Sequence, residues 1–459
     1  MSTAAGTPHA SIERDASICA SYARDASGLT KPPEGVVRAA ESADVVELLR
    51  EAHRDGTAVT PAGAQTSTTG ASIAERGLLL SMRAMSRILD IDVAARTVRV
   101  EPGVILGDLD RAVAGEGLFF APDPTSDQEC TVGGSIACNA SGPRTLRYGA
   151  TRAHVRGLTV ALADGRVIEL RRPALEKNTV GYFPAQDPID WFVGSEGTLG
   201  VILSAELSLR PRAVVEVGLG IPFPSQTDAL TFIVAAREDT SLLPRCLEYF
   251  DAEAFRIARH EEPSWGHDGN TMVYLEHAGD EDAPFDAWLS LAQRFNGQVD
   301  SARVFDGDAA MRTARRLRHA VPATMHERVA PFLAHGGRRV STDWAVPYRR
   351  AAEILAQADA FAHEAGIAPA VTYGHLGNGH PHQNFVARDP AEVARAEKVV
   401  ERTLHAVMAM GGTVAAEHGI GKVKSKWLPL QASALQLGMM RAIKRELDPS
   451  GILSPGNIL

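Results

Sequence analysis

Apolar residues recur along most of the chain at spacings typical of regular secondary structure. An apolar residue every three or four positions predicts a helix, and a short apolar run closed by turn residues predicts a strand. Predicted helices cover residues 43–53, 106–114, 228–237, 285–295, 310–319, 351–364, 391–410 and 435–447. Predicted strands cover residues 57–60, 78–82, 88–92, 97–101, 155–162, 166–170, 201–209, 214–221, 272–276 and 371–373. From about residue 212 onward strands and amphipathic helices alternate, which indicates an α+β domain.

Two glycine-rich stretches interrupt this pattern, at residues 61–70 and 121–152. A loop as long as the second is usually functional or disordered, and its apolar residues favour an ordered loop that wraps a ligand, with one short helical insert at 134–139. Separated glycine-rich loops can offer backbone N–H groups to phosphate oxygens. Neither stretch fits a P-loop or a GxGxxG signature, so glycine content alone leaves phosphate binding open.

Composition narrows the class of protein. A chain of 459 residues is too long for one ordinary core, so two or three domains are expected. The hydrophobic share of 45% and the charged share of 22% are typical of a soluble globular protein. The net charge of −9 argues against nucleic acid as a partner.

Cysteine use and the N-terminal sequence suggest a location. The four cysteines lie far apart with no CxxC pair, which favours reduced thiols in a cytosolic-type compartment. Residues 1–17 do not resemble a secretory signal, and no stretch approaches the ~18 apolar residues of a membrane span. We therefore expect a cytoplasmic protein with at most peripheral contact to the inner membrane.

Histidines and a carboxylate gather late in the chain. Residues 374–384 read Gly-His-Leu-Gly-Asn-Gly-His-Pro-His-Gln-Asn, and residues 416–419 read Ala-Glu-His-Gly. Neutral imidazole and carboxylate are common ligands of divalent metals, and histidine can also accept a proton near neutral pH. For an isolated histidine pair, capping and core hydrogen bonds are the more common roles, so the histidines alone do not predict a metal site.

Four motifs in order carry a family resemblance. They are Pro-x-Gly-x-x-Thr-Ser-x-x-Gly at 61–70, Pro-Asp-Pro-Thr-Ser at 122–126, Val-Gly-Gly-x-Ile-Ala-x-Asn-Ala-x-Gly at 132–142 and Gly-Ser-Glu-Gly-Thr-Leu-Gly at 194–200. Together they resemble the FAD domain of the vanillyl-alcohol oxidase / p-cresol methylhydroxylase flavoproteins. Residues 138–142 and the histidine cluster resemble the D-2-hydroxyacid dehydrogenase branch, which includes D-lactate and D-2-hydroxyglutarate dehydrogenases and the glycolate oxidase flavin subunit. The resemblance covers roughly residues 31–459.

The resemblance implies an α+β fold in which a two-subdomain FAD-binding domain is joined to an α+β substrate (cap) domain. The implied limits are a loosely ordered lead-in at 1–30, the FAD-binding domain at 31–211, the substrate domain with the metal site at 212–428, and a C-terminal segment at 429–459 that packs back on the FAD domain. A homodimer is possible.

The resemblance also implies where FAD binds. The loop at 61–70 would cradle the pyrophosphate, residues 124–126 and 133–142 would line the ribityl chain and isoalloxazine, and residues 196–202 would lie by the adenine half. No histidine lies in the first loop, so non-covalent FAD is expected. Plain packing closure is an equal alternative for Asn457, and Cys138 is interpreted as a small buried thiol. The implied cofactor residues are Pro61, Gly63, Ala64, Gln65, Thr66, Ser67, Gly70, Pro124, Thr125, Ser126, Gly133, Gly134, Ala137, Cys138, Asn139, Ser141, Gly142, Tyr148, Glu196, Gly197, Gly200, Ile202 and Asn457.

The reaction site follows from the same resemblance, which implies oxidation of a D-2-hydroxy acid with hydride transfer to flavin N5. The implied roles are a divalent metal (Zn, Mn or Fe) on His375, His382 and Glu417, a general base at His418, carboxylate binding at Arg318 and substrate contact at Asn384.

Three residues depart from the pattern of the relatives near this site. Asn378 and His380 stand where relatives often carry Asp and Asn. Ser341 occupies the slot of a lysine that contacts the distal carboxylate in 2-hydroxyglutarate-type enzymes. This favours a D-lactate-like monocarboxylate as substrate.

Two other functions remain open at this stage. A non-catalytic flavin-binding subunit of a larger oxidase would keep the cofactor loops but not need the histidines. A metal-dependent hydrolase would use the histidines and leave the flavin loops unexplained. The sequence does not identify the electron acceptor, for which a quinone, a cytochrome or an electron-transfer flavoprotein are the family expectations.

Overall fold

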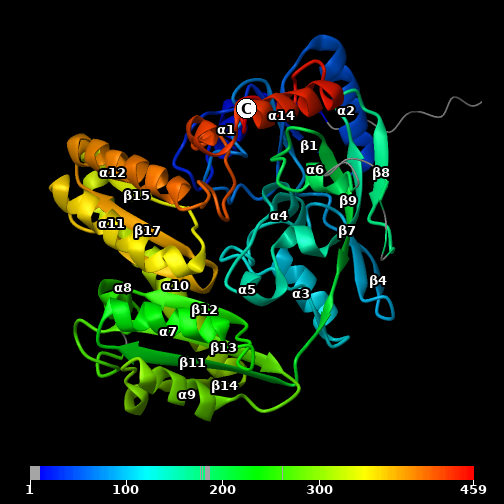
Figure 1. The fold of residues 1–459 in the computed structure, drawn as a ribbon. Helices are drawn as coiled ribbons and strands as arrows, with labels where there is room; N and C mark the ends of the chain where they lie inside the picture. Colours follow the sequence, from blue (N-terminus) through cyan, green and yellow to red (C-terminus); the bar gives the residue numbers. More distant parts are fainter. Residues whose placement is uncertain (1–10, 176, 178, 181–186, 261) are drawn as a thin grey trace, which may run out of the picture. The chain divides into compact units, whose positions relative to one another are not determined.

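The structure is a computed structural model that describes residues 11–175, 177, 179–180, 187–260 and 262–459 (Figure 1). The chain divides into two compact units. The first unit combines the described residues up to Ser141 with residues 150–212 and 417–459, and the second combines residues 142–149 and 213–416. The C-terminal segment therefore returns to the first unit. The predicted limits of the FAD-binding domain, 31–211, and of the substrate domain, 212–428, remain predictions.

Within its described residues, the first unit contains three sheets. A five-stranded antiparallel sheet has the order β4-β5-β9-β7-β8, a three-stranded parallel sheet has the order β1-β3-β2, and β6 pairs with β10. The strands are β1 (Gly35–Arg38), β2 (Val59–Ala62), β3 (Leu78–Ser81), β4 (Ile88–Asp92), β5 (Thr97–Val100), β6 (Leu118–Phe119), β7 (Val155–Ala161), β8 (Val167–Arg171), β9 (Val201–Ser208) and β10 (Arg210–Pro211). The helices are α1 (Ala16–Ser21), α2 (Ser42–Asp55), α3 (Leu106–Ala114), α4 (Val132–Cys138), η1 (Thr151–His154), α6 (Ile189–Phe192), η6 (Ser425–Trp427), α13 (Leu428–Gln431) and α14 (Ala434–Leu447).

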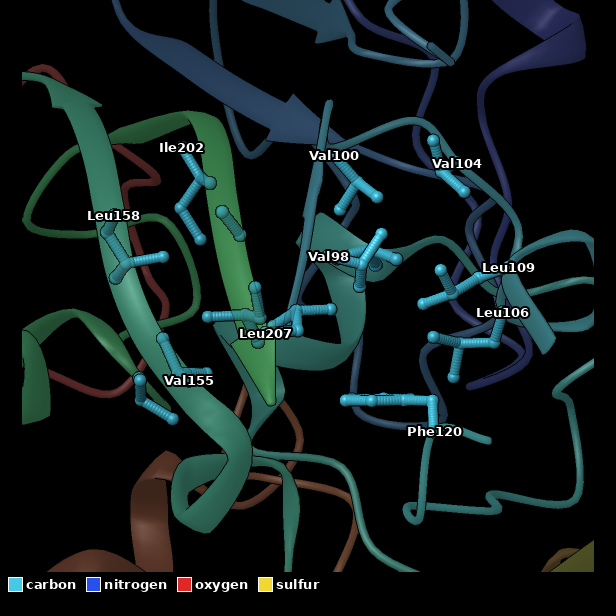
Figure 2. Packing of buried hydrophobic residues seen from close by; sticks show 14 of the residues in the cluster. Val98, Val100, Val104, Leu106, Leu109, Phe120, Val155, Leu158, Ile202 and Leu207 are labelled. Atoms are coloured by element: carbon cyan, nitrogen blue, oxygen red, sulfur yellow. The ribbon is translucent and has the colours of Figure 1, made fainter. Parts of the chain in front are cut away.

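Alternating residues of the five-stranded sheet build the larger core of this unit. Figure 2 shows Val98, Leu158 and Leu207 on β5, β7 and β9, with Leu109 of α3 in the same cluster. All four side chains are almost fully buried. Each such side chain contributes roughly 1.5–3 kcal/mol by leaving water. This packing fixes β7 and β9, the strands that follow the cofactor motifs at 132–142 and 194–200.

The second unit is built on one seven-stranded antiparallel sheet with the order β14-β11-β13-β12-β16-β17-β15. Its strands are β11 (Val215–Phe223), β12 (Cys246–Phe250), β13 (Thr271–Gly279), β14 (Arg303–Asp306), β15 (Arg338–Ser341), β16 (Val371–His375) and β17 (His380–Ala387). Its helices are α5 (Thr145–Tyr148), α7 (Gln226–Glu238), α8 (Ala252–Ala258), α9 (Phe285–Arg294), η2 (Val299–Ser301), α10 (Gly307–Val329), η3 (Ala330–His335), η4 (Tyr348–Arg350), α11 (Ala351–Glu364), η5 (Leu376–Asn378) and α12 (Pro390–Ala409).

Helices cover both faces of this sheet. On one face α8 and α10 pack against a core that includes Phe250, Met272, Val321 and Tyr373. On the other face α7 packs against β11, β12 and β13, and α12 packs against β15, β17 and α11, as Figure 1 shows for α11 and α12. These elements confirm the predicted α+β class. Within the described residues, no helix combines the length and apolar character needed to cross a membrane.

The expectation of a loosely ordered lead-in is wrong for residues 11–30. Asp15 caps α1 by accepting hydrogen bonds from the backbone N–H groups of Ser17 and Ile18, and Cys19 of the same helix is buried. Glu13 forms an antiparallel bridge with Val36 of β1. A short cap and one buried side chain are weak periodic signals, which is why this sequence looks irregular. The rest of that prediction, residues 1–10, lies outside the described residues.

Two further expectations need correction around the histidines. Strand β17 was not predicted, because Pro381 breaks the run of strand-forming residues. At Pro381 only β16 is a neighbour, since β15 pairs with Asn384 to Ala387, and proline is tolerated where one side of a strand is unpaired. Helix α10 was predicted to end at residue 319 but continues to Val329 through Pro322. Buried Val321 and Met325 supply the packing that outweighs the missing proline N–H.

The connection between β16 and β17 depends on Gly379. This residue has φ +71°, and a Cβ atom there would lie 1.9 Å from the carbonyl oxygen of Val346. Gly366, which follows α11, has φ +65° but no heavy atom within 4 Å of the same position. The two glycines therefore share the left-handed backbone and differ in the space available for a side chain.

We expect Gly379→Ala to lower the denaturant midpoint of unfolding more than Gly366→Ala does. Left-handed backbone alone costs roughly 1–2 kcal/mol for alanine, and overpacking at residue 379 adds roughly 1–3 kcal/mol. Equilibrium unfolding followed by circular dichroism measures both losses. Equal losses would contradict the steric account of the turn.

Candidate functional site

The loop after β2 presents open backbone donors. In the described part of the chain, the N–H groups of residues 63–67 donate no hydrogen bond to another protein group. Gln65 has φ 57°, a left-handed conformation that favours glycine. Its amide donates to the carbonyl oxygens of Tyr22, at 3.0 Å, and Ser72, at 3.4 Å. The side chain is thus anchored away from the loop backbone and leaves the N–H groups available.

The end of the same loop is held by its own side chains. Ser67 Oγ accepts from the N–H groups of Thr69, at 3.2 Å, and Ala71, at 3.3 Å. Gly70 follows with φ +76°. These bonds within the loop help to fix its backbone conformation.

The second glycine-rich motif begins at α4. Thr131 Oγ1 accepts from the N–H of Gly134 at 3.2 Å and caps this helix. A Cβ on Gly133 would lie 2.6 Å from the Cβ of Pro102, so only glycine fits there. Asn139 ends the helix with φ 50°, and its Oδ1 accepts from the N–H of Arg152 at 2.9 Å. Helices α5 and η1 follow, so the stretch at 121–152 contains three short helical segments instead of the single one expected.

Other predicted cofactor residues lie in turns and on β9. The carbonyl oxygens of Pro124 and Ser126 accept from the N–H groups of Asp127 and Cys130, which makes a closed turn around Thr125. Ile202 packs its side chain into the large core. The remaining positions follow the same motifs: Ala137 and Ser141 lie on or just after α4, Gly197 and Gly200 precede β9, and Gly142 and Tyr148 group with the second unit.

Glu196 joins the cofactor motifs to the C-terminal segment. Its carboxylate accepts from the N–H groups of Ile420 and Gly421 at 2.6 and 2.7 Å. Burial raises the pKa of this carboxyl group, and the two backbone hydrogen bonds oppose that rise. Thr69 of the first loop accepts from Lys422 N–H through its carbonyl oxygen at 2.9 Å and donates to the carbonyl oxygen of His418 at 3.4 Å. The backbone of His418 is therefore fixed next to the loop at 61–70.

Asn457 closes the first unit. Its amide donates to the carbonyl oxygens of Ala71, at 2.8 Å, and Glu196, at 3.1 Å, and its Oδ1 accepts from Lys422 at 2.5 Å. Desolvation lowers the pKa of Lys422 to about 8. These bonds favour packing closure as the role of Asn457.

The second unit gathers its site residues on one sheet face. Residues opposite one another in antiparallel strands point to the same face. His375 lies opposite His380, Tyr373 opposite His382, and Ser341 opposite Asn384. The register of β15, β16 and β17 therefore places three histidines and Asn384 together, on the face that α10 covers.

The histidine rings form a compact cluster. The centroids of His375, His380 and His382 lie 4.6 to 5.6 Å apart. His375 Nδ1 lies 2.7 Å from Oε1 of Glu248, and its Nε2 lies 3.4 Å from Nε2 of His382. His380 Nδ1 donates to the carbonyl oxygen of Trp344 at 2.8 Å. Because a carboxylate can only accept, neutral His375 carries its proton on Nδ1 and turns a lone pair toward His382.

Arg318 reaches the same cluster from α10. Its Nε lies 3.3 Å from Oε2 of Glu248, whose side chain is almost fully buried. The sequence interpretation named Arg318 and missed Glu248. The available signal was an acidic residue in the middle of an otherwise apolar strand, Cys-Leu-Glu-Tyr-Phe, in which every residue is buried.

Glu417 begins the third segment of the first unit. Its predecessor Ala416 donates its N–H to the carbonyl oxygen of Asp343 at 2.8 Å, within the second unit. Asp343 Oδ1 lies 3.5 Å from Nε2 of His380. Ala416, the residue before Glu417, is therefore hydrogen-bonded to a residue that lies beside His380. The Cα atoms of neighbouring residues are about 3.8 Å apart.

Known proteins similar to this chain match it over almost its whole length. Residues 33–171 match the FAD binding domain family, and residues 212–458 match the C-terminal domain of FAD linked oxidases. The chain is 30% identical to D-2-hydroxyglutarate dehydrogenase of Xanthomonas citri pv. viticola, over 95% of this chain and 92% of that protein. It is 31% identical to D-lactate dehydrogenase of Archaeoglobus fulgidus, over 92% and 91%, and 30% identical to glycolate oxidase subunit GlcD of Bacillus subtilis, over 93% and 89%. An alkyldihydroxyacetonephosphate synthase shares the fold, with a TM-score of 0.71 at 18% identity over 93% of this chain and 77% of the other.

The chain belongs to the FAD-linked oxidases, a family of FAD-binding oxidoreductases. This confirms the predicted flavoprotein family, the enzyme class and FAD as cofactor. The open N–H groups at 63–67 fit that cofactor, since they provide donors for a pyrophosphate. The roles of the individual site residues remain predictions.

Cys138 lies in a cofactor motif but has the environment of an unreactive thiol. Desolvation, with a smaller contribution from Glu196, raises its pKa to about 12. Desolvation also raises the thiol pKa of Cys130 and Cys246, and Cys19 is buried. Thiolate is the reactive form, so a raised pKa makes a thiol slow to react.

We expect the native protein to show no rapidly reacting thiol toward Ellman's reagent at about pH 8, because thiolate is scarce well below the thiol pKa. In denatured protein all four thiols should react with the reagent in one fast phase. Cys138→Ala identifies any fast native signal that comes from this residue. A fast native phase lost in that variant would contradict the assignment of an inert thiol.

Proposed function

We propose that the chain oxidises a D-2-hydroxy acid to the 2-oxo acid and needs FAD and a divalent metal ion. Relatives named D-2-hydroxyglutarate dehydrogenase, D-lactate dehydrogenase and glycolate oxidase subunit support the substrate class. The observation that carries the proposal is the facing pair of Nε2 atoms on His375 and His382, 3.4 Å apart.

That pair supports a metal site. With Nδ1 of His375 committed to Glu248, its Nε2 lone pair points at His382, and a proton or a cation must lie between the two rings. Two imidazole nitrogens and a carboxylate are a common donor set for Zn²⁺, Mn²⁺ or Fe²⁺. Glu417 supplies the carboxylate in this proposal, since its neighbour Ala416 is anchored beside the cluster.

Each remaining site residue takes one task. Arg318 binds the substrate carboxylate, for which a guanidinium is well shaped. His418 accepts the hydroxyl proton, and its backbone is held to Thr69 in the cofactor loop. Asn384 contacts the substrate from β17. When bound, FAD supplies the hydride acceptor and the metal ion polarises the hydroxyl group.

The substrate we favour is a short monocarboxylate similar to D-lactate. Ser341 lies directly opposite Asn384 and offers only a small neutral hydroxyl group there. A second carboxylate on the substrate would need a cation at this position. Electrons then pass to a quinone, a cytochrome or an electron-transfer flavoprotein.

Anaerobic flavin bleaching tests the reaction. Purified protein should be yellow, and D-lactate should bleach its visible absorbance while L-lactate does not. His418→Ala should slow bleaching by about 10²- to 10⁴-fold, because the proton acceptor is removed, and should retain FAD. His405→Ala is the matched control, because this exposed histidine on α12 lies outside the proposed site.

Three results would contradict this function. They are the absence of bleaching across a panel of D-2-hydroxy acids, an active colourless protein, and wild-type bleaching in His418→Ala. The first result would favour a non-catalytic flavin subunit, and the last would remove His418 as the base.

Metal analysis tests the ligand set. Wild-type protein should retain a divalent ion in stoichiometric amount through gel filtration, and His382→Ala should lose it while keeping FAD, because one of two nitrogen ligands is gone. His405→Ala should match the wild type. Elemental analysis and the flavin spectrum measure the two contents. Metal-free wild-type protein with full bleaching activity would contradict the metal site.

A further inference from the structure

One buried carboxylate touches two different parts of the proposed reaction site. Glu248 lies in the middle of β12 with 0% of its surface exposed. Its Oε1 is 2.7 Å from Nδ1 of His375, and its Oε2 is 3.3 Å from Nε of Arg318. The two partners come from β16 and from α10, and they are the proposed metal ligand and the proposed carboxylate-binding residue.

The cost of burying this group indicates a specific role. An ionised carboxylate in a protein interior costs several kcal/mol unless it is well paired. Cys246 and Phe250, which share its face of β12, pack in the core, so an apolar residue would suit this position equally well for stability. The carboxylate is instead directed at two site residues, one with each oxygen.

We propose that Glu248 is a positioning residue that holds the His375 ring and the Arg318 guanidinium in fixed relation to each other. This inference rests on the proposed function. Accepting from Nδ1–H keeps the Nε2 lone pair of His375 directed at His382, as carboxylates do for many metal-bound histidines. Contact at Nε sets the plane of the Arg318 guanidinium and hence the direction of its terminal nitrogens.

The consequence for the substrate is a fixed spacing. A 2-hydroxy acid carries its hydroxyl and carboxylate groups on adjacent carbon atoms, so the metal end and the arginine end of the site must stay at one separation. A single carboxylate that is hydrogen-bonded to His375 and ion-paired with Arg318 provides that constraint. Small misplacement of reacting groups is costly for catalysis, so loss of Glu248 should affect both ends together.

A neighbouring carboxylate offers a matched control. Glu276 lies on β13 opposite Cys246 and pairs with Arg245 at 2.7 Å, with 14% of its side chain exposed against 1% for Glu248. Burial raises the pKa of its carboxyl group, but Arg245 and Arg144 outweigh this and hold it at about 2. Within the described residues, its carboxylate pairs with Arg245 and Arg144 and accepts from Tyr274. Glu276→Gln therefore reports the general cost of removing a largely buried, paired charge from this sheet.

The test compares Glu248→Gln, Glu248→Asp and Glu276→Gln as FAD-loaded proteins. Calorimetric titration of chelator-treated protein with Zn²⁺ should show about 10- to 100-fold weaker binding in Glu248→Gln, because an amide is uncharged and has only one acceptor oxygen for the two partners. The KM for D-lactate should rise in the same variant, and Glu248→Asp should recover part of both losses. Glu276→Gln should lower thermal stability and leave zinc affinity unchanged.

Nitrogen NMR of ¹⁵N-histidine-labelled protein gives a readout that needs neither metal nor turnover. The His375 signals, assigned with His375→Ala, should show protonation at Nδ1 in the wild type and a changed tautomer in Glu248→Leu, which has no acceptor for that N–H. Unchanged zinc affinity and KM in Glu248→Gln, with an unchanged tautomer in Glu248→Leu, would overturn the positioning role. If wild-type protein binds none of the three divalent ions, or no D-2-hydroxy acid bleaches its flavin, the proposed function fails, and the tautomer comparison still decides the role of Glu248.

Discussion

The contact on which the site depends is the hydrogen bond between Glu248 and His375. It fixes which nitrogen of His375 carries the proton, and so directs the other nitrogen at His382, 3.4 Å away. The register of β16 against β17 brings the two rings together, and Gly379 permits the tight connection between these strands. A shift of one residue in this register would move alternate side chains to the opposite face of the sheet. The chemistry is therefore set by backbone pairing before any ligand binds.

The cofactor motifs are organised by backbone hydrogen-bond donors and by one buried carboxylate. The N–H groups of residues 63–67 are available to an anion, while the Glu196 carboxylate accepts from the N–H groups of Ile420 and Gly421. These two hydrogen bonds connect the returning C-terminal segment to a cofactor motif and hold the backbone around His418 in place. Family membership identifies FAD as the cofactor. The proposed base, His418, belongs to the unit that carries most of the cofactor motifs.

Local features could be predicted from the sequence, and nonlocal ones could not. The strand at 88–92 and the helices at 106–114 and 351–364 match the observed limits, because their periodicity and end signals are local. Strand β17 was missed because Pro381 conceals it, and α10 was cut short at Pro322, where packing outweighs propensity. The motifs identified His375, His382 and Arg318, but Glu248 is 127 residues from His375 in sequence and becomes visible only once the strands are paired.

Anomalous diffraction at the absorption edge of the bound metal, from crystals of the FAD-loaded protein, tests the central claim most directly. The account predicts one strong peak between Nε2 of His375 and Nε2 of His382, at about 2.0–2.1 Å from each for zinc, with Glu417 as the carboxylate ligand. A peak bound elsewhere, or metal-loaded crystals without a peak at these two nitrogens, would contradict it.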